Sequence, residues 1–226
     1  MKSMTTCVAL ALTALVAAGC NRNPNDNARQ DSAVGTAGRS DALLGNDDRD
    51  LLSDAAIADL AEIELGKMAV ERGTHPGVKK YGQMMIDDHT RGSQKLEKLA
   101  GNYGLTLPRG LDDDHVELRD KLAREGSDFD REYLDAMIDA HESLLDKLGS
   151  RVDKEKLNEW RTRMSNRATG EKIDHEVEST MIVAEPSDDK IKAQINQWAA
   201  ETYPVVFAHQ QAAKDLKETV QKSRTN

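Results

Sequence analysis

The chain has 226 residues, with 31 Lys and Arg against 40 Asp and Glu, and its net charge at neutral pH is −9. A negatively charged chain has no general attraction for phosphate backbones, so nucleic acid is excluded as an expected partner. Aromatic residues make up only 4% and charged residues 31%, a balance that fits Ala- and Leu-lined helices and argues against an all-β fold.

The first twenty residues have the pattern of a bacterial secretion signal. Lys2 precedes an apolar run over residues 7–16, which is well short of the ~20 residues that a membrane-spanning helix needs. Small residues then lead into Cys20, which resembles the lipobox of bacterial lipoproteins, where the cysteine is lipidated and begins the mature chain. We therefore expect a signal peptide over residues 1–19 and a lipid anchor at Cys20.

The residues after the cysteine indicate where the protein resides. Asn21 stands where an inner-membrane retention signal would have Asp, so the resemblance implies an outer-membrane lipoprotein that faces the periplasm. Residues 20–46 are rich in Asn, Asp, Gly, Ser and Arg and contain too few apolar residues to form a core. We expect them to be a flexible tether between the membrane and a folded domain over residues 47–222.

Four long helices are predicted from stripes of apolar residues at helical spacing, and breakers such as Gly and Pro separate them. The predicted fold class is therefore all-α, with long antiparallel helices that bury their stripes against one another. The expected ranges are about 47–72, 76–102, 127–148 and 191–216, with a shorter helix over 112–124.

A highly charged segment over residues 150–185 separates the third and fourth long helices. It contains two short apolar stripes on either side of Gly170, whose regular spacing predicts a helical hairpin that extends the bundle. Its charged surface is the expected contact for a protein partner, and a disordered insert is the alternative. The stripes consist of Leu157, Trp160 and Met164 and of Ile173, Val177 and Met181.

Four segments, DLAEIELGKMA (59–69), MIDDHT (85–90), FDREYLDAM (129–137) and DAHE (139–142), resemble the domain-of-unknown-function family numbered 4142. The resemblance implies a ferritin-like antiparallel four-helix bundle in the bacterial envelope, with the charged hairpin as an insertion between helices three and four. It implies no catalytic residues.

Three histidines lie inside the apolar stripes of three different helices. They are His89, His141 and His209, and Glu64 is assigned to the stripe of the first helix. A helical bundle can hold a metal in this way, and three imidazoles with one carboxylate suit Zn, Cu, Fe or Ni. Glu64 and His89 are expected at the same depth because the turn at Pro76 lies midway between them. The predicted transition-metal site is Glu64, His89, His141 and His209.

Two features argue against this site. Ferritin-like di-iron sites need a Glu three residues before each His, and Ile86, Ile138 and Val206 occupy those positions. Straight helices that turn near Gly170 would also leave the histidines of helices three and four about 15 Å out of register, at ~1.5 Å per residue.

No nucleophile elbow, phosphate-binding loop or metalloprotease motif is present in the sequence. The first interpretation is therefore a non-enzymatic envelope lipoprotein with a binding or structural role, in which the histidines are hydrogen-bonded core residues. The alternative is a helical bundle that binds a metal ion through these residues and could use that ion in redox chemistry.

The lipid anchor can be tested directly. Cys20→Ala is expected to abolish lipidation and release the protein from the membrane fraction, because no later segment is apolar enough to hold it there. Membrane fractionation after a salt wash measures the effect. Unchanged membrane association of the variant would contradict the assignment.

Overall fold

The computed structural model describes residues 43–165 and 182–225, and within these ranges every regular element is an α-helix. The predicted all-α fold is confirmed. The predicted signal peptide, Cys20, most of the tether and the second stripe of the hairpin lie outside the described residues. In chain order the helices are α2 (Asn46–Arg72), α3 (Pro76–Gly101), α4 (Asp113–Arg124), α5 (Phe129–Gly149), α6 (Lys154–Ser165) and α8 (Lys190–Thr225).

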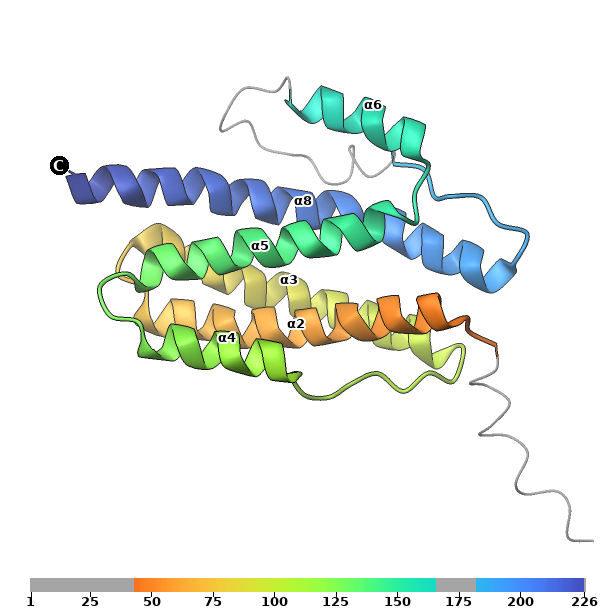
Figure 1. Ribbon diagram of the computed structural model, residues 1–226, viewed down its shortest axis with the longest axis horizontal. Helices are drawn as coiled ribbons and strands as arrows, with labels where there is room; N and C mark the ends of the chain where they lie inside the picture. The colour runs from red at the N-terminus through yellow and green to blue at the C-terminus, as the bar shows by residue number, and fades with distance from the viewer. Residues whose placement is uncertain (1–42, 166–181, 226) are drawn as a thin grey trace, which may run out of the picture. The chain divides into compact units, whose positions relative to one another are not determined.

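The four long helices pack as two antiparallel pairs, α2 with α3 and α5 with α8 (Figure 1). Two glycines allow α2 and α3 to approach closely. A Cβ atom on Gly66 would lie 2.7 Å from the carbonyl oxygen of Gly82, and a Cβ atom on Gly82 would lie 2.7 Å from that of Gly66. Because any side chain would clash with backbone here, glycine is required at this crossing.

Asp130, in the first turn of α5, ties the two helix pairs together. Its carboxylate is buried and accepts hydrogen bonds from the backbone N–H groups of Thr74 (2.9 Å) and His75 (2.7 Å) and from the Thr74 hydroxyl (2.6 Å). These donors belong to the turn between α2 and α3, where His75 caps the N-terminus of α3 by accepting from Gly77 N–H. The second pair is thereby fixed against the end of the first.

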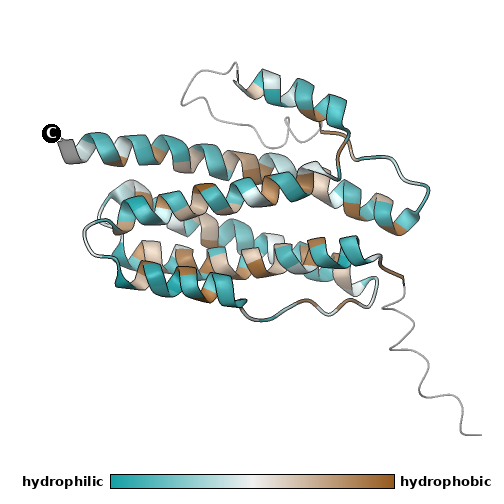
Figure 2. Ribbon diagram, viewed as in Figure 1, coloured by the Kyte–Doolittle hydropathy of each residue, from teal (hydrophilic) through white to brown (hydrophobic). Residues whose placement is uncertain are grey.

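The interior of the bundle contains a polar layer between two apolar clusters. Figure 2 shows apolar residues interleaved with hydrophilic ones along every long helix. Each of these helices places a buried Glu or His between its contributions to the two clusters, namely Glu62, His89, His141 and His209, and Asp59 of α2 and Gln210 of α8 are buried in the same layer. One cluster contains Leu52 of α2, Leu96 of α3, Leu148 of α5 and Val206 of α8. The other contains, from the same helices in the same order, Leu65, Met85, Met137 and Ala213.

Helix α6 is the first limb of the predicted hairpin, and it packs against α8. The Trp160 ring centroid lies 4.8 Å from that of Phe207 and 5.7 Å from that of Tyr203, both on α8. Leu157 and Met164 are also buried. The prediction that this limb extends the bundle lengthwise is wrong, because folding back onto α8 removes the apolar stripe of α6 from water.

No helix of the described ranges combines the length and the apolar character that crossing a bilayer requires.

The packing of α6 predicts that it contributes to the stability of the bundle. Trp160→Ala should lower the free energy of unfolding by about 3–5 kcal/mol, the usual cost of truncating a buried aromatic residue. Glu155→Ala, at an exposed position of the same helix, is the control and should change it by less than about 0.5 kcal/mol. Urea unfolding followed by circular dichroism measures both. Equal stabilities would show that α6 is not part of the core.

Candidate metal centre

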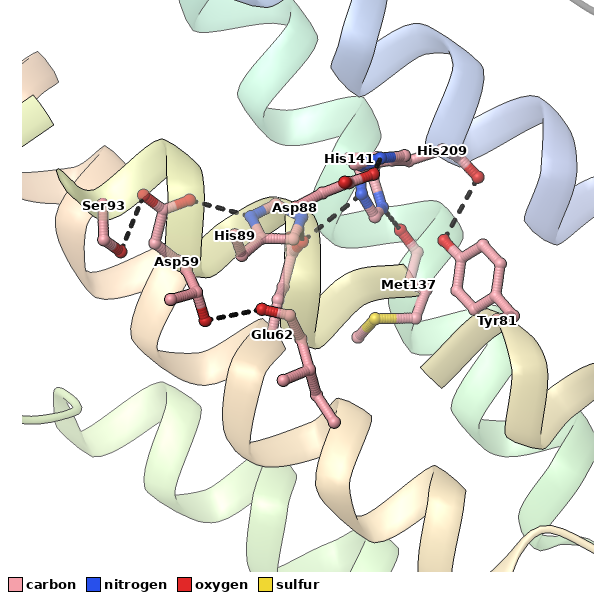
Figure 3. Close-up of polar contacts among 11 residues, drawn as sticks. Asp59, Glu62, Tyr81, Asp88, His89, Ser93, Met137, His141 and His209 are labelled. Carbon is pink, nitrogen blue, oxygen red and sulfur yellow. Dashed lines mark hydrogen bonds and ion pairs between the residues drawn. The ribbon is translucent and has the colours of Figure 1, made fainter. Parts of the chain in front are cut away.

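His89 of α3, His141 of α5 and His209 of α8 converge in the polar layer (Figure 3). Their ring centroids are 5.3 to 6.0 Å apart, and one nitrogen from each ring lies within 4.8 Å of the other two. The predicted offset of about 15 Å between His141 and His209 is wrong. α5 ends at Gly149 and α8 begins at Lys190, so these helices do not run straight to a common turn.

The carboxylate of the site comes from Glu62, and the prediction of Glu64 is wrong. Glu64 is exposed on the opposite side of α2, where its carboxylate lies 3.6 Å from the guanidinium of Arg119. A step of two residues turns a side chain by about 200° around the helix axis, so Glu62 and Glu64 face opposite directions. Glu62 itself is 1% exposed.

The sequence does contain a signal for Glu62. The buried stripe of α2 passes through small residues such as Ala55 and Ala69, and Glu62 follows the same three- and four-residue steps. Leu60 and Met68, the larger residues that lie four positions before and after Glu64 and share its face, are only partly buried. Small residues line the inner face because α2 packs so closely against α3.

Glu62 and the three histidines turn polar atoms toward one another. Glu62 Oε2 pairs with His89 Nε2 at 2.5 Å and lies 3.3 Å from His141 Nε2. Glu62 Oε1, His141 Nε2 and His209 Nδ1 are buried and have no hydrogen-bond partner within the described part of the chain. Buried polar atoms normally have partners, so three such atoms around one ion pair indicate a site that a further group completes.

The opposite nitrogen of each ring is held by a hydrogen-bonding group outside the centre. Such contacts fix the orientation of an imidazole and leave its other nitrogen free to bind a metal, which is the usual arrangement of metal-ligating histidines. The pairs are His89 Nδ1 with Asp59 Oδ1 at 2.8 Å, His141 Nδ1 with the Met137 carbonyl oxygen at 2.5 Å, and His209 Nε2 with Asp88 Oδ2 at 2.8 Å.

The charges of the site are strongly coupled. Burial opposes ionisation of Glu62, but attraction by His141 and His89 lowers the pKa of Glu62 to about 2. Burial also disfavours a charged His89, but the charge of Glu62 and the hydrogen bond to Asp59 raise the pKa of His89 to about 10. Burial lowers the pKa of His141, and it lowers that of His209 to about 4. Without a metal, Glu62 and His89 therefore form a buried ion pair at the centre of the site.

All three histidines are buried and each makes a hydrogen bond, as the structural interpretation expects, but not every ring nitrogen has such a partner. His141 does bond a backbone carbonyl, as that interpretation expects. Tyr81, however, donates to the backbone carbonyl of His209 at 3.1 Å and not to an imidazole. The Tyr133 hydroxyl is buried and has no hydrogen-bond partner within residues 43–165 and 182–225. His141 Nε2 and His209 Nδ1 are therefore left for another ligand, whereas His89 Nε2 pairs with Glu62.

Comparison with known proteins gives one match. The sequence pattern of the family described as "Domain of unknown function (DUF4142)" matches residues 33–170, which is more than half of the chain. This segment includes Glu62, His89 and His141 and ends before α8, which carries His209. No curated protein and no solved structure matched the chain.

The two glutamates of α2 provide a test of the assignment in metal-free protein. Glu62→Leu should lower the free energy of unfolding by about 3 kcal/mol, because the buried charge of His89 loses its closest partner. Glu64→Leu, two residues away and exposed, is the matched control and should change it by less than about 0.5 kcal/mol. Denaturant unfolding in the presence of a chelator measures both. A larger effect for Glu64 would contradict the placement of Glu62 in the site.

Proposed function

The chain belongs to the family described as "Domain of unknown function (DUF4142)", and we propose that it is a metal-binding protein of the bacterial envelope. The observation that carries this proposal is the convergence of three buried imidazole nitrogens and one buried carboxylate, in which His141 Nε2, His209 Nδ1 and Glu62 Oε1 have no hydrogen-bond partner among the described residues. As purely structural groups, buried polar atoms without partners cost roughly 1–3 kcal/mol each. One divalent cation would satisfy all of them together.

The donor set fits a transition metal. Imidazole and carboxylate suit Zn, Cu, Fe and Ni, and such ions bind nitrogen at ~2.0–2.1 Å. Nitrogens at most 4.8 Å apart can reach one ion through small rotations of the rings. The cation would replace the proton that His89 shares with Glu62, because both need their lone pairs to bind metal. Three imidazoles and one carboxylate are too few ligands for a di-iron centre, so the proposed site is mononuclear.

The proposed fold is a ferritin-like antiparallel four-helix bundle that places one ligand on each long helix. The two antiparallel pairs and the polar layer across all four helices support it. The proposed location is the outer membrane, with the bundle facing the periplasm on a tether from lipidated Cys20. The lipobox-like residues before Cys20 and the polar tether support this location.

Metal analysis and thermal unfolding of the untagged protein test the metal site. We expect about one transition-metal ion per chain and a rise in melting temperature when metal is added to chelator-treated protein. At a free metal concentration of 100 times Kd, the stabilisation is about 2.7 kcal/mol.

Substitution of the ligands identifies the residues that hold the ion. His89→Leu, His141→Leu, His209→Leu and Glu62→Leu should each remove most of the metal-induced shift, because each deletes one donor. Glu64→Leu should retain the full shift. If the wild type and all five variants gave the same shift, the metal-binding proposal would be refuted and the structural interpretation would stand.

A further inference from the structure

A cleft of about 290 Å³ lies beside the metal centre, between α3 and α8. Exposed Arg91 and Lys95 of α3 and Glu201 of α8 lie at its edge. His89 and His209 line its inner part, so two of the three imidazoles border it. The cleft therefore runs from charged surface residues to the ligands of the proposed site.

Two carboxylates that line the cleft are hydrogen-bonded to the buried imidazoles behind them. The side chain of Asp88 is 25% exposed and that of Asp59 is 13% exposed, and both line the cleft. The side chains of His89 and His209 are 6% and 3% exposed, and that of Glu62 is 2% exposed. Exposure thus falls from the two carboxylates on the cleft to the donors of the proposed site, among which His141, at 0%, does not border the cleft.

We propose that the metal is exchangeable and that a divalent cation enters and leaves through this cleft, with Asp88 and Asp59 as its transient ligands. This inference rests on the proposed function. A cation that binds the Asp88 carboxylate competes with the hydrogen bond from His209 and releases that ring to turn. The ion can then pass from carboxylate oxygen to imidazole nitrogen without losing all of its ligands at once.

Gly92 keeps the cleft open beside Asp59. It lies inside α3, where glycine costs ~1 kcal/mol relative to alanine. A Cβ atom at this position would lie 3.4 Å from Asp59 Oδ2, an ordinary contact that does not require glycine for packing. A larger side chain would cover the Asp59 carboxylate and narrow the route.

Arg91 controls the charge at the outer end of the cleft. Its guanidinium pairs with Asp88, and its side chain is 66% exposed. A cation that approaches Asp88 therefore meets a positive charge and must displace this ion pair. Removing the charge should speed metal uptake, and this effect is opposite to that of blocking the cleft.

The test is the rate of metal exchange in the full-length protein, with Zn²⁺ as the probe. Uptake is followed in a stopped-flow mixer, and release is followed by transfer to a chromophoric chelator. Gly92→Leu should slow uptake and release each at least tenfold while changing Kd by less than about threefold. Gly101→Leu, at a position where a Cβ atom meets nothing within 4 Å, is the matched control on the same helix.

Arg91→Gln provides a second variant that does not depend on fitting a larger side chain. It should speed Zn²⁺ uptake about threefold or more at low salt, whereas Arg124→Gln, exposed on α4, should leave the rate unchanged. Wild-type rates in Gly92→Leu would overturn the route, as would equal uptake rates in Arg91→Gln and Arg124→Gln. Stoichiometric binding with unaffected rates refutes only this inference, whereas no binding by the wild type refutes the proposed function as well.

Discussion

The arrangement of the bundle depends on the compensation of charge at its centre. Glu62 is a carboxylate buried in an interior that is otherwise apolar on both sides, and an isolated charge there would be very unfavourable. His89 and His141 come within ion-pair distance of it from two other helices. The charge of Glu62 is therefore compensated mainly by His89 within the α2–α3 pair, and His141 of α5 adds a contact from the second pair.

The rest of the structure brings these groups into contact. The glycine crossing of α2 and α3 brings Glu62 within reach of His89, and Asp130 fixes the start of α5 against the turn between them. Asp59 and Asp88 orient the imidazoles from outside, so the centre is surrounded by a second set of polar contacts. Packing, capping and electrostatics support the same geometry.

Sequence periodicity was sufficient to predict most helices and to place the three histidines on inward faces, but it did not predict that they lie at one depth. An imidazole at the third or fourth position of an apolar stripe has to face the interior, so His89, His141 and His209 could be placed without a structure. Glu64 was chosen over Glu62 because much of the inner stripe of α2 consists of small residues such as Ala55 and Ala69, which the close packing of α3 buries. The depth of His209 depends on where α8 begins and on how α6 folds back, which are tertiary properties that spacing along the chain does not encode.

The placement of one donor on each of four helices also affects the order of folding. The ligand set is complete only after α8 docks, because Glu62 and His209 come from opposite ends of the folded chain. No helix pair contains all four donors, so neither pair alone can form the complete site. An ion bound at the proposed site would act as a reversible cross-link that closes a loop spanning most of the domain, and closing such a loop early would carry a large entropic cost. By linkage, any substitution that loosens the docking of one pair on the other would lower the apparent affinity for that ion, however far the substitution lies from the proposed ligands.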